Sequence, residues 1–113
     1  MTIVVVPYRT LITDLVKRIR GSGIECIEWK HGETNPASVV VVSADIAGDI
    51  LGDGNFLSYA RLLCNKGVLR RVVVDECHLI YTSSDWRPKL AGLKNLRLLP
   101  CLIVLLTATL PPL

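Results

Sequence analysis

Two adjacent acids, Asp75 and Glu76, follow an apolar run at residues 71–74 and precede Cys77 and His78. A buried parallel strand that ends in acids places them at the carboxyl edge of a sheet, where open α/β folds bind ligands. In nucleotide hydrolases, such an aspartate holds Mg²⁺ through water, and the next acid orients or deprotonates the attacking water. A second interpretation stays open, in which both acids cap a following turn or helix.

A second apolar run, residues 101–106, ends in two hydroxyls around a small residue, at Thr107, Ala108 and Thr109. The two segments together resemble motifs II and III of the superfamily 2 helicases: a DECH box, then a Ser/Thr-Ala-Thr tripeptide about thirty residues later. This resemblance implies ATP and Mg²⁺ as cofactors, with ATP contacted by both Asp75 and Glu76.

The same resemblance assigns roles to individual residues of the two motifs. Asp75 would be the Mg²⁺ ligand, and the catalytic set would be Asp75, Glu76 and His78. Hydrolysis would be coupled to DNA through a group that consists of His78, Thr107, Ala108 and Thr109. For His78, a hydrogen-bonded imidazole in the core is the alternative, and Cys77 is expected to be a buried, inert thiol.

The loop after the DECH box resembles the aromatic-rich loop of RecQ-type helicases. Trp86 and Arg87 precede Pro88, as an aromatic precedes Arg-Pro in that loop, and Tyr81 supplies a further aromatic. Bases stack on such rings, and arginine binds phosphate or adds a cation–π attraction. The resemblance therefore implies that Tyr81, Trp86 and Arg87 contact DNA. The alternative is that Trp86 packs in the core while Arg87 pairs with a neighbouring acid.

The segment at residues 6–11 resembles helicase motif Ia, which begins with a strand and a proline and then directs a helix start toward the DNA backbone. Pro7, Arg9 and Thr10 are the matching positions and are expected to bind nucleic acid. Thr10 could equally be the N-cap of the following helix. The family's strand-Ser-Pro-Glu motif corresponds to Ser43, Ala44 and Asp45, and the two departures weaken a nucleic-acid role there.

A Gly-x-x-x-x-Gly-Lys-Ser/Thr phosphate loop does not occur in the sequence. In the helicase family, this loop precedes the motif Ia strand and a second RecA-like domain follows motif III. Residues 1–113 are therefore expected to be one partial ATP-binding domain of a RecQ-like DNA helicase, inactive alone. Two alternatives are a noncatalytic nucleic-acid-binding module and an interaction remnant that pairs through an exposed sheet edge.

Alternating apolar runs and amphipathic segments must position these residues. The expected strands are residues 3–6, 24–29, 39–42, 71–74 and 101–106, and their continuous β-branched composition favours burial on both faces of a parallel sheet. One helix would bury Leu11, Leu15, Val16 and Ile19 and stop at Gly21 and Gly23. A second would bury Phe56, Tyr59, Ala60 and Leu63, and a third would span residues 86–93. This pattern predicts a three-layer α/β sandwich, mainly parallel; the resemblance makes it RecA-like without its phosphate-loop strand and helix.

Composition sets the remaining limits. The 113 residues fit one domain, and a composition of 50% hydrophobic and 20% charged residues favours a buried core over disorder. A net charge of +3 permits a polyanionic partner, and the resemblance implies single-stranded or junction DNA. Four scattered cysteines favour an intracellular, reducing compartment. The apolar stretches are too short for a signal peptide or a membrane span, so the expected location is the nucleus or otherwise the cytoplasm. The basic cluster of Lys66, Arg70 and Arg71 is expected to be solvated surface.

Overall fold

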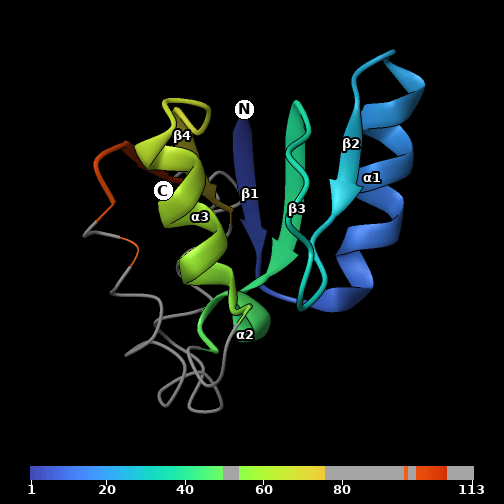
Figure 1. The fold of residues 1–113 in the computed structure, drawn as a ribbon. Coiled ribbons are helices and arrows are strands. Elements are labelled where there is room, and N and C mark those ends of the chain that lie inside the picture. Colours follow the sequence, from blue (N-terminus) through green and yellow to red (C-terminus); the bar gives the residue numbers. More distant parts are fainter. Residues whose placement is uncertain (50–53, 76–95, 97–98, 107–113) are drawn as a thin grey trace, which may run out of the picture.

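The computed structural model describes residues 1–49, 54–75, 96 and 99–106, and every expected apolar run within them forms a strand. The strands are β1 Thr2–Val6, β2 Cys26–Glu28, β3 Val39–Ser43, β4 Arg71–Val74 and β5 Leu102–Leu105. They form one five-stranded sheet in the order β2-β3-β1-β4-β5, with every pair parallel. All five strands therefore end at the same edge of the sheet (Figure 1).

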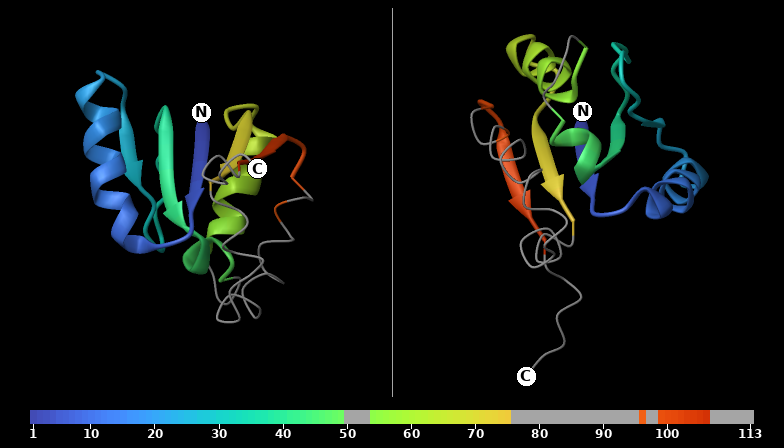
Figure 2. Two further views of the ribbon diagram at one scale, coloured as in Figure 1. Left: turned by 180° about the vertical axis from the view of Figure 1, so that it is seen from behind. Right: turned by 90° about the horizontal axis from the view of Figure 1, so that it is seen from below.

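Helices cover both faces of this sheet. A short 3₁₀ helix, η1 Arg9–Leu11, leads into α1 Ile12–Gly21, and α2 Ala44–Ala47 and α3 Phe56–Asn65 follow β3. Viewed from below, α1 lies on one face and α3 lies on the opposite face (Figure 2). The predicted three-layer α/β architecture is confirmed, whereas the expected third helix, residues 86–93, lies outside the described residues. No helix in the described part of the chain is long and apolar enough to cross a membrane.

Side-chain alternation along the central strands supplies both halves of the core. Ile3 and Val5 of β1 point into the larger cluster, which contains four buried residues of α3: Phe56, Tyr59, Ala60 and Leu63. Val6 and Val41 point the other way, against Ile12 and Val16 of α1. Because both faces of β1 and β3 are covered, valine and isoleucine suit nearly every position of these strands.

Three local expectations differ from the structure. Leu11 is 44% exposed because the chain makes a 3₁₀ turn before the α-helix begins, so Ile12 takes the predicted core position of Leu11. The short helix α2 was not expected, because four residues carry too little periodicity to be recognised. Strand β5 is an edge strand with Leu102 and Leu105 exposed, so the expected burial of both its faces is wrong within the described residues.

An aromatic cluster of Trp29, Phe56 and Tyr59 packs the segment after β2 against α3. The Trp29 ring meets the Phe56 ring edge-on, with centroids 5.3 Å apart, and Tyr59 lies 5.8 Å from Trp29. The Tyr59 hydroxyl donates a hydrogen bond to the Asn35 carbonyl over 2.8 Å. This cluster closes the larger half of the core where β2 and β3 are connected by a long loop.

Phe56 tests the aromatic cluster, since its side chain is completely buried. We expect Phe56→Ala to lower the free energy of unfolding by about 3 to 5 kcal/mol, because it removes a large apolar side chain and leaves a cavity. Leu62→Ala on the same helix is the matched control; Leu62 is 50% exposed, and the expected change is below about 0.5 kcal/mol. Urea unfolding of both variants checks this, and equal midpoints for the two would contradict it.

Candidate nucleic-acid site at the carboxyl edge of the sheet

The ends of β1 and β4 lie next to each other at the carboxyl edge. Val5 is paired with Val74, and the backbone N–H of Asp75 donates a hydrogen bond to the Val5 carbonyl over 2.9 Å. Asp75 is therefore fixed beside the end of β1, one strand away from the segment that begins with Pro7. The structure thus brings together the ends of two segments that are far apart in the sequence and that were both predicted to carry function.

Strand β5 ends beside β4 at the same edge. Leu105 is paired with Val74, and the backbone N–H of Leu106 donates to the Val74 carbonyl over 2.9 Å. Leu106 directly precedes Thr107 in the sequence. Eight predicted site residues lie outside the described part of the chain: Glu76, His78, Tyr81, Trp86, Arg87, Thr107, Ala108 and Thr109.

The segment after β1 presents some predicted residues to solvent and buries another. The Pro7 ring is almost completely buried, so Pro7 directs the backbone at the end of β1 and its ring does not reach the surface. Arg9 and Thr10 follow on η1, and both are exposed. Neither η1 nor α1 has a side-chain N-cap, because Tyr8 and Leu11 occupy those positions without a capping hydrogen bond. The capping interpretation of Thr10 is therefore wrong.

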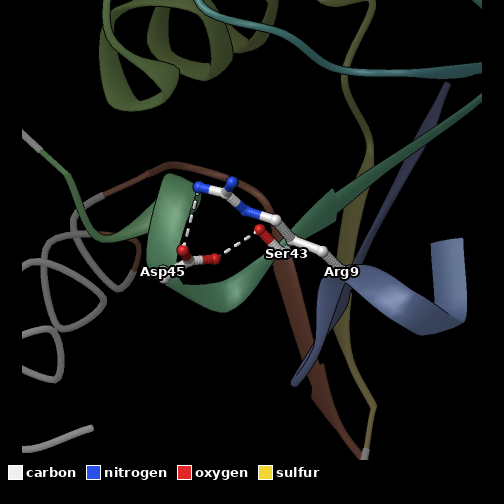
Figure 3. A network of polar contacts seen from close by, with 3 residues as sticks. All are labelled: Arg9, Ser43 and Asp45. Carbon is white, nitrogen blue, oxygen red and sulfur yellow. Dashed lines mark hydrogen bonds and ion pairs between the residues drawn. The ribbon is translucent and has the colours of Figure 1, made fainter. Parts of the chain in front are cut away.

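Arg9 joins a polar network with the end of β3 (Figure 3). Its Nη2 atom lies 3.1 Å from Oδ2 of Asp45, which is in the first turn of α2. The Ser43 hydroxyl donates a hydrogen bond to Oδ1 of Asp45 over 2.5 Å. Sequence reasoning missed this network because Arg9 and Asp45 are 36 positions apart and only the parallel pairing of β1 with β3 brings them together.

Charged side chains are distributed unevenly between the carboxyl edge of the sheet, where the strands end, and the amino edge, where they begin. The carboxyl edge carries the Arg9 guanidinium together with the carboxylates of Asp45 and Asp75. Lys66, Arg70 and Arg71 are exposed, as expected, and they belong to the amino edge, where the Arg70 N–H donates to the Met1 carbonyl and Arg71 begins β4. The basic cluster therefore lies away from the candidate site.

Asp75 has the chemistry of a magnesium ligand. It is a half-buried carboxylate whose backbone is fixed at a strand end, and Mg²⁺ prefers such oxygen ligands together with water. Asp75 is a single such ligand, and the described residues contain no group of three or more His, Cys, Asp or Glu that could hold a metal ion. A nucleotide site also needs groups that bind the phosphates. The sequence holds no Gly-Lys pair to contact β- and γ-phosphates.

A groove of about 750 Å³ lies between α1 and the edge strand β2. Charges of both signs line it, among them Lys17, Glu25 and Glu28. Arg20 donates from Nε to the Cys26 carbonyl over 2.8 Å, so it satisfies a backbone acceptor of this edge strand. Charged side chains along an edge strand oppose strand addition by another chain, and this groove is therefore consistent with edge protection.

Two cysteines that sequence spacing does not connect lie together. The Cys64 and Cys101 thiols share a hydrogen bond, and both side chains are half-buried against the larger core cluster. Burial, followed by the hydrogen bond and charge of Cys64, raises the pKa of Cys101 from 9.0 to about 11. Cys64 is at the end of α3 and Cys101 precedes β5, so this contact joins a helix to the edge strand.

No protein-family model matches this chain.

The raised pKa of Cys101 predicts a loss of stability at alkaline pH. In the folded chain this thiol keeps its proton up to about pH 11, whereas in the unfolded chain it loses the proton near pH 9. Its contribution is therefore fully present below pH 9 and is lost as the pH rises toward 11. Urea unfolding at about pH 8 and about pH 10.5 should show a smaller pH-dependent loss in Cys101→Ala than in the wild type.

Leu102→Ala is the control for this experiment, because it changes the neighbouring exposed position without removing a titratable group. It should keep the pH dependence of the wild type. An unchanged pH dependence in Cys101→Ala would show that this thiol titrates alike in the folded and unfolded chains.

Proposed function

We propose that this chain is a segment of the first ATP-binding domain of a RecQ-like DNA helicase, and that its carboxyl edge faces the nucleic acid and the nucleotide. The observation that carries the proposal is the order β1-β4-β5 at this edge. The three segments that resemble motifs Ia, II and III follow these three adjacent strands. Ligands of open parallel sheets bind at the carboxyl edge. Segments that follow three adjacent strands at this edge are therefore close enough to couple a nucleotide to a nucleic acid.

Within the site, the residues divide by chemistry. Arg9 and Thr10 are exposed cation and hydroxyl groups on a turn after β1, which suits them to phosphate oxygens of a nucleic-acid backbone. Asp75 would hold Mg²⁺ of a bound nucleotide, and Glu76 would activate water. The resemblance assigns Tyr81, Trp86 and Arg87 to base and phosphate contacts, and it assigns His78 with Thr107, Ala108 and Thr109 to coupling.

The chain by itself is proposed to lack useful catalysis. Phosphoryl transfer depends on positioning of the phosphates and on stabilisation of charge in the transition state. The Gly-Lys loop that performs both tasks in helicases does not occur in this sequence. ATP and Mg²⁺ chemistry would therefore need residues from another part of a longer protein or from a partner chain.

A specific observation favours each of the two alternatives. Arg9 is 67% exposed on the 3₁₀ turn after β1, which suits a noncatalytic nucleic-acid-binding module. The edge strand β5 exposes Leu102 and Leu105, which suits an interaction remnant that adds a strand from another chain. Binding of DNA that ignores Mg-ATP would favour the module, and concentration-dependent sedimentation without DNA binding would favour the remnant.

Arg9→Gln tests the nucleic-acid contact. Single-stranded DNA should bind the wild type in a salt-dependent manner, and loss of one phosphate contact should make the slope of log K against log salt shallower by about 0.7. We expect the variant to bind about five-fold more weakly at low salt, measured by fluorescence anisotropy of a labelled single strand.

The matched control is Arg18→Gln. Arg18 is likewise an exposed arginine in an ion pair, 3.0 Å from Asp14, but it lies on α1 away from the carboxyl edge. This variant removes the same charge and should have little effect on binding. Equal weakening by both substitutions would show that only net charge attracts DNA.

ATP turnover tests the statement about catalysis. The purified chain should show no DNA-stimulated hydrolysis above background when single-stranded DNA and Mg²⁺ are present, because it has no phosphate-binding loop. The assay measures released phosphate. DNA-stimulated turnover that disappears in Glu76→Gln would contradict the proposal, since it would assign hydrolysis to this chain.

A further inference from the structure

We infer that Asp45 is a positioning residue that holds the Arg9 guanidinium in place for a phosphate of a nucleic-acid backbone. This inference rests on the proposed role of Arg9 and extends it to a residue whose departure from the helicase pattern argued against any such role. Three observations support it: how Asp45 is fixed, how it contacts Arg9, and how differently the two side chains are exposed.

Asp45 is anchored to the sheet through Ser43. Ser43 is completely buried at the end of β3, and it is paired with Val6 at the end of β1. Its hydroxyl donates to Oδ1 of Asp45 over 2.5 Å. The Asp45 side chain is only 23% exposed, so its carboxylate has a defined place above the strand end (Figure 3).

The Asp45 carboxylate orients the Arg9 side chain. The Arg9 side chain is 67% exposed and has many rotamers, and Nη2 meets Oδ2 of Asp45 at 3.1 Å. A guanidinium carries five N–H donors in a rigid fork. One contact at Nη2 restricts where the group can move and leaves further donors to bind a phosphate oxygen. A held arginine loses less side-chain entropy when it binds than an arginine that moves freely.

Competition is the opposite possibility, in which Asp45 would neutralise Arg9 and repel phosphate. The two ideas predict opposite signs for the removal of Asp45. If Asp45 positions Arg9, then Asp45→Ala weakens binding although it removes a negative charge. If Asp45 competes, the same substitution strengthens binding.

The experiment measures binding of labelled oligothymidylate to the full chain at two salt concentrations. We expect Asp45→Ala to weaken binding about three-fold at low salt. Asp45→Asn should have a dissociation constant within about two-fold of the wild-type value. Its amide oxygen can accept a hydrogen bond from Arg9 while its NH₂ group donates to the Ser43 hydroxyl. Asp45→Gln carries the same amide as Asp45→Asn but displaces it on a longer side chain, so it should bind as weakly as Asp45→Ala. It gives a second test if Asp45→Ala does not fold.

A double-mutant cycle with Arg9→Gln separates positioning from a general structural role. If Asp45 acts through Arg9, Asp45→Ala has no further effect in the Arg9→Gln background. A loss that persists there, or tighter binding by Asp45→Ala, overturns the inference while the proposed role of Arg9 stands. Unchanged binding by Arg9→Gln alone overturns both.

Discussion

Parallel pairing of β1 with both β3 and β4 is the constraint on which the rest of this structure depends. β1 lies at the centre of the sheet, with Ile3, Val5 and Val6 buried between helices on either face. Since parallel neighbours must run in the same direction, the chain leaves β1, β3 and β4 at one edge. Arg9, Asp45 and Asp75, which follow these three strands, are thereby brought to the same edge of the sheet, whatever their distance along the sequence.

The polar groups at that edge differ in how firmly they are held. The Asp75 backbone is bonded to β1, and Asp45 is tied to buried Ser43, whereas Arg9 extends into solvent from a turn. Fixed acids beside an exposed arginine form a surface that can hold a cation at one point and a phosphate at another. Strands thus supply the rigid positions and the connecting turns supply the group that meets the ligand.

Much of this fold could be predicted from the sequence, because β-branched runs such as residues 39–42 are unambiguous when both sheet faces are covered. The helix face of α3 was equally clear from Phe56, Tyr59, Ala60 and Leu63. The start of α1 was not, since Leu11 and Ile12 are both apolar and only the 3₁₀ turn decides which is buried. The contacts between Arg9 and Asp45 and between Cys64 and Cys101 depend on strand order, for which residue spacing carries no signal.

We propose that the carboxyl edge, and not the more basic amino edge, meets the nucleic acid. Amide chemical shifts of the chain, recorded during titration with single-stranded DNA, test this most directly. We expect the largest changes at Arg9, Thr10, Asp45 and Asp75. Changes confined to Lys66, Arg70 and Arg71 would contradict it, because they would show that DNA follows positive charge alone to the opposite edge of the sheet.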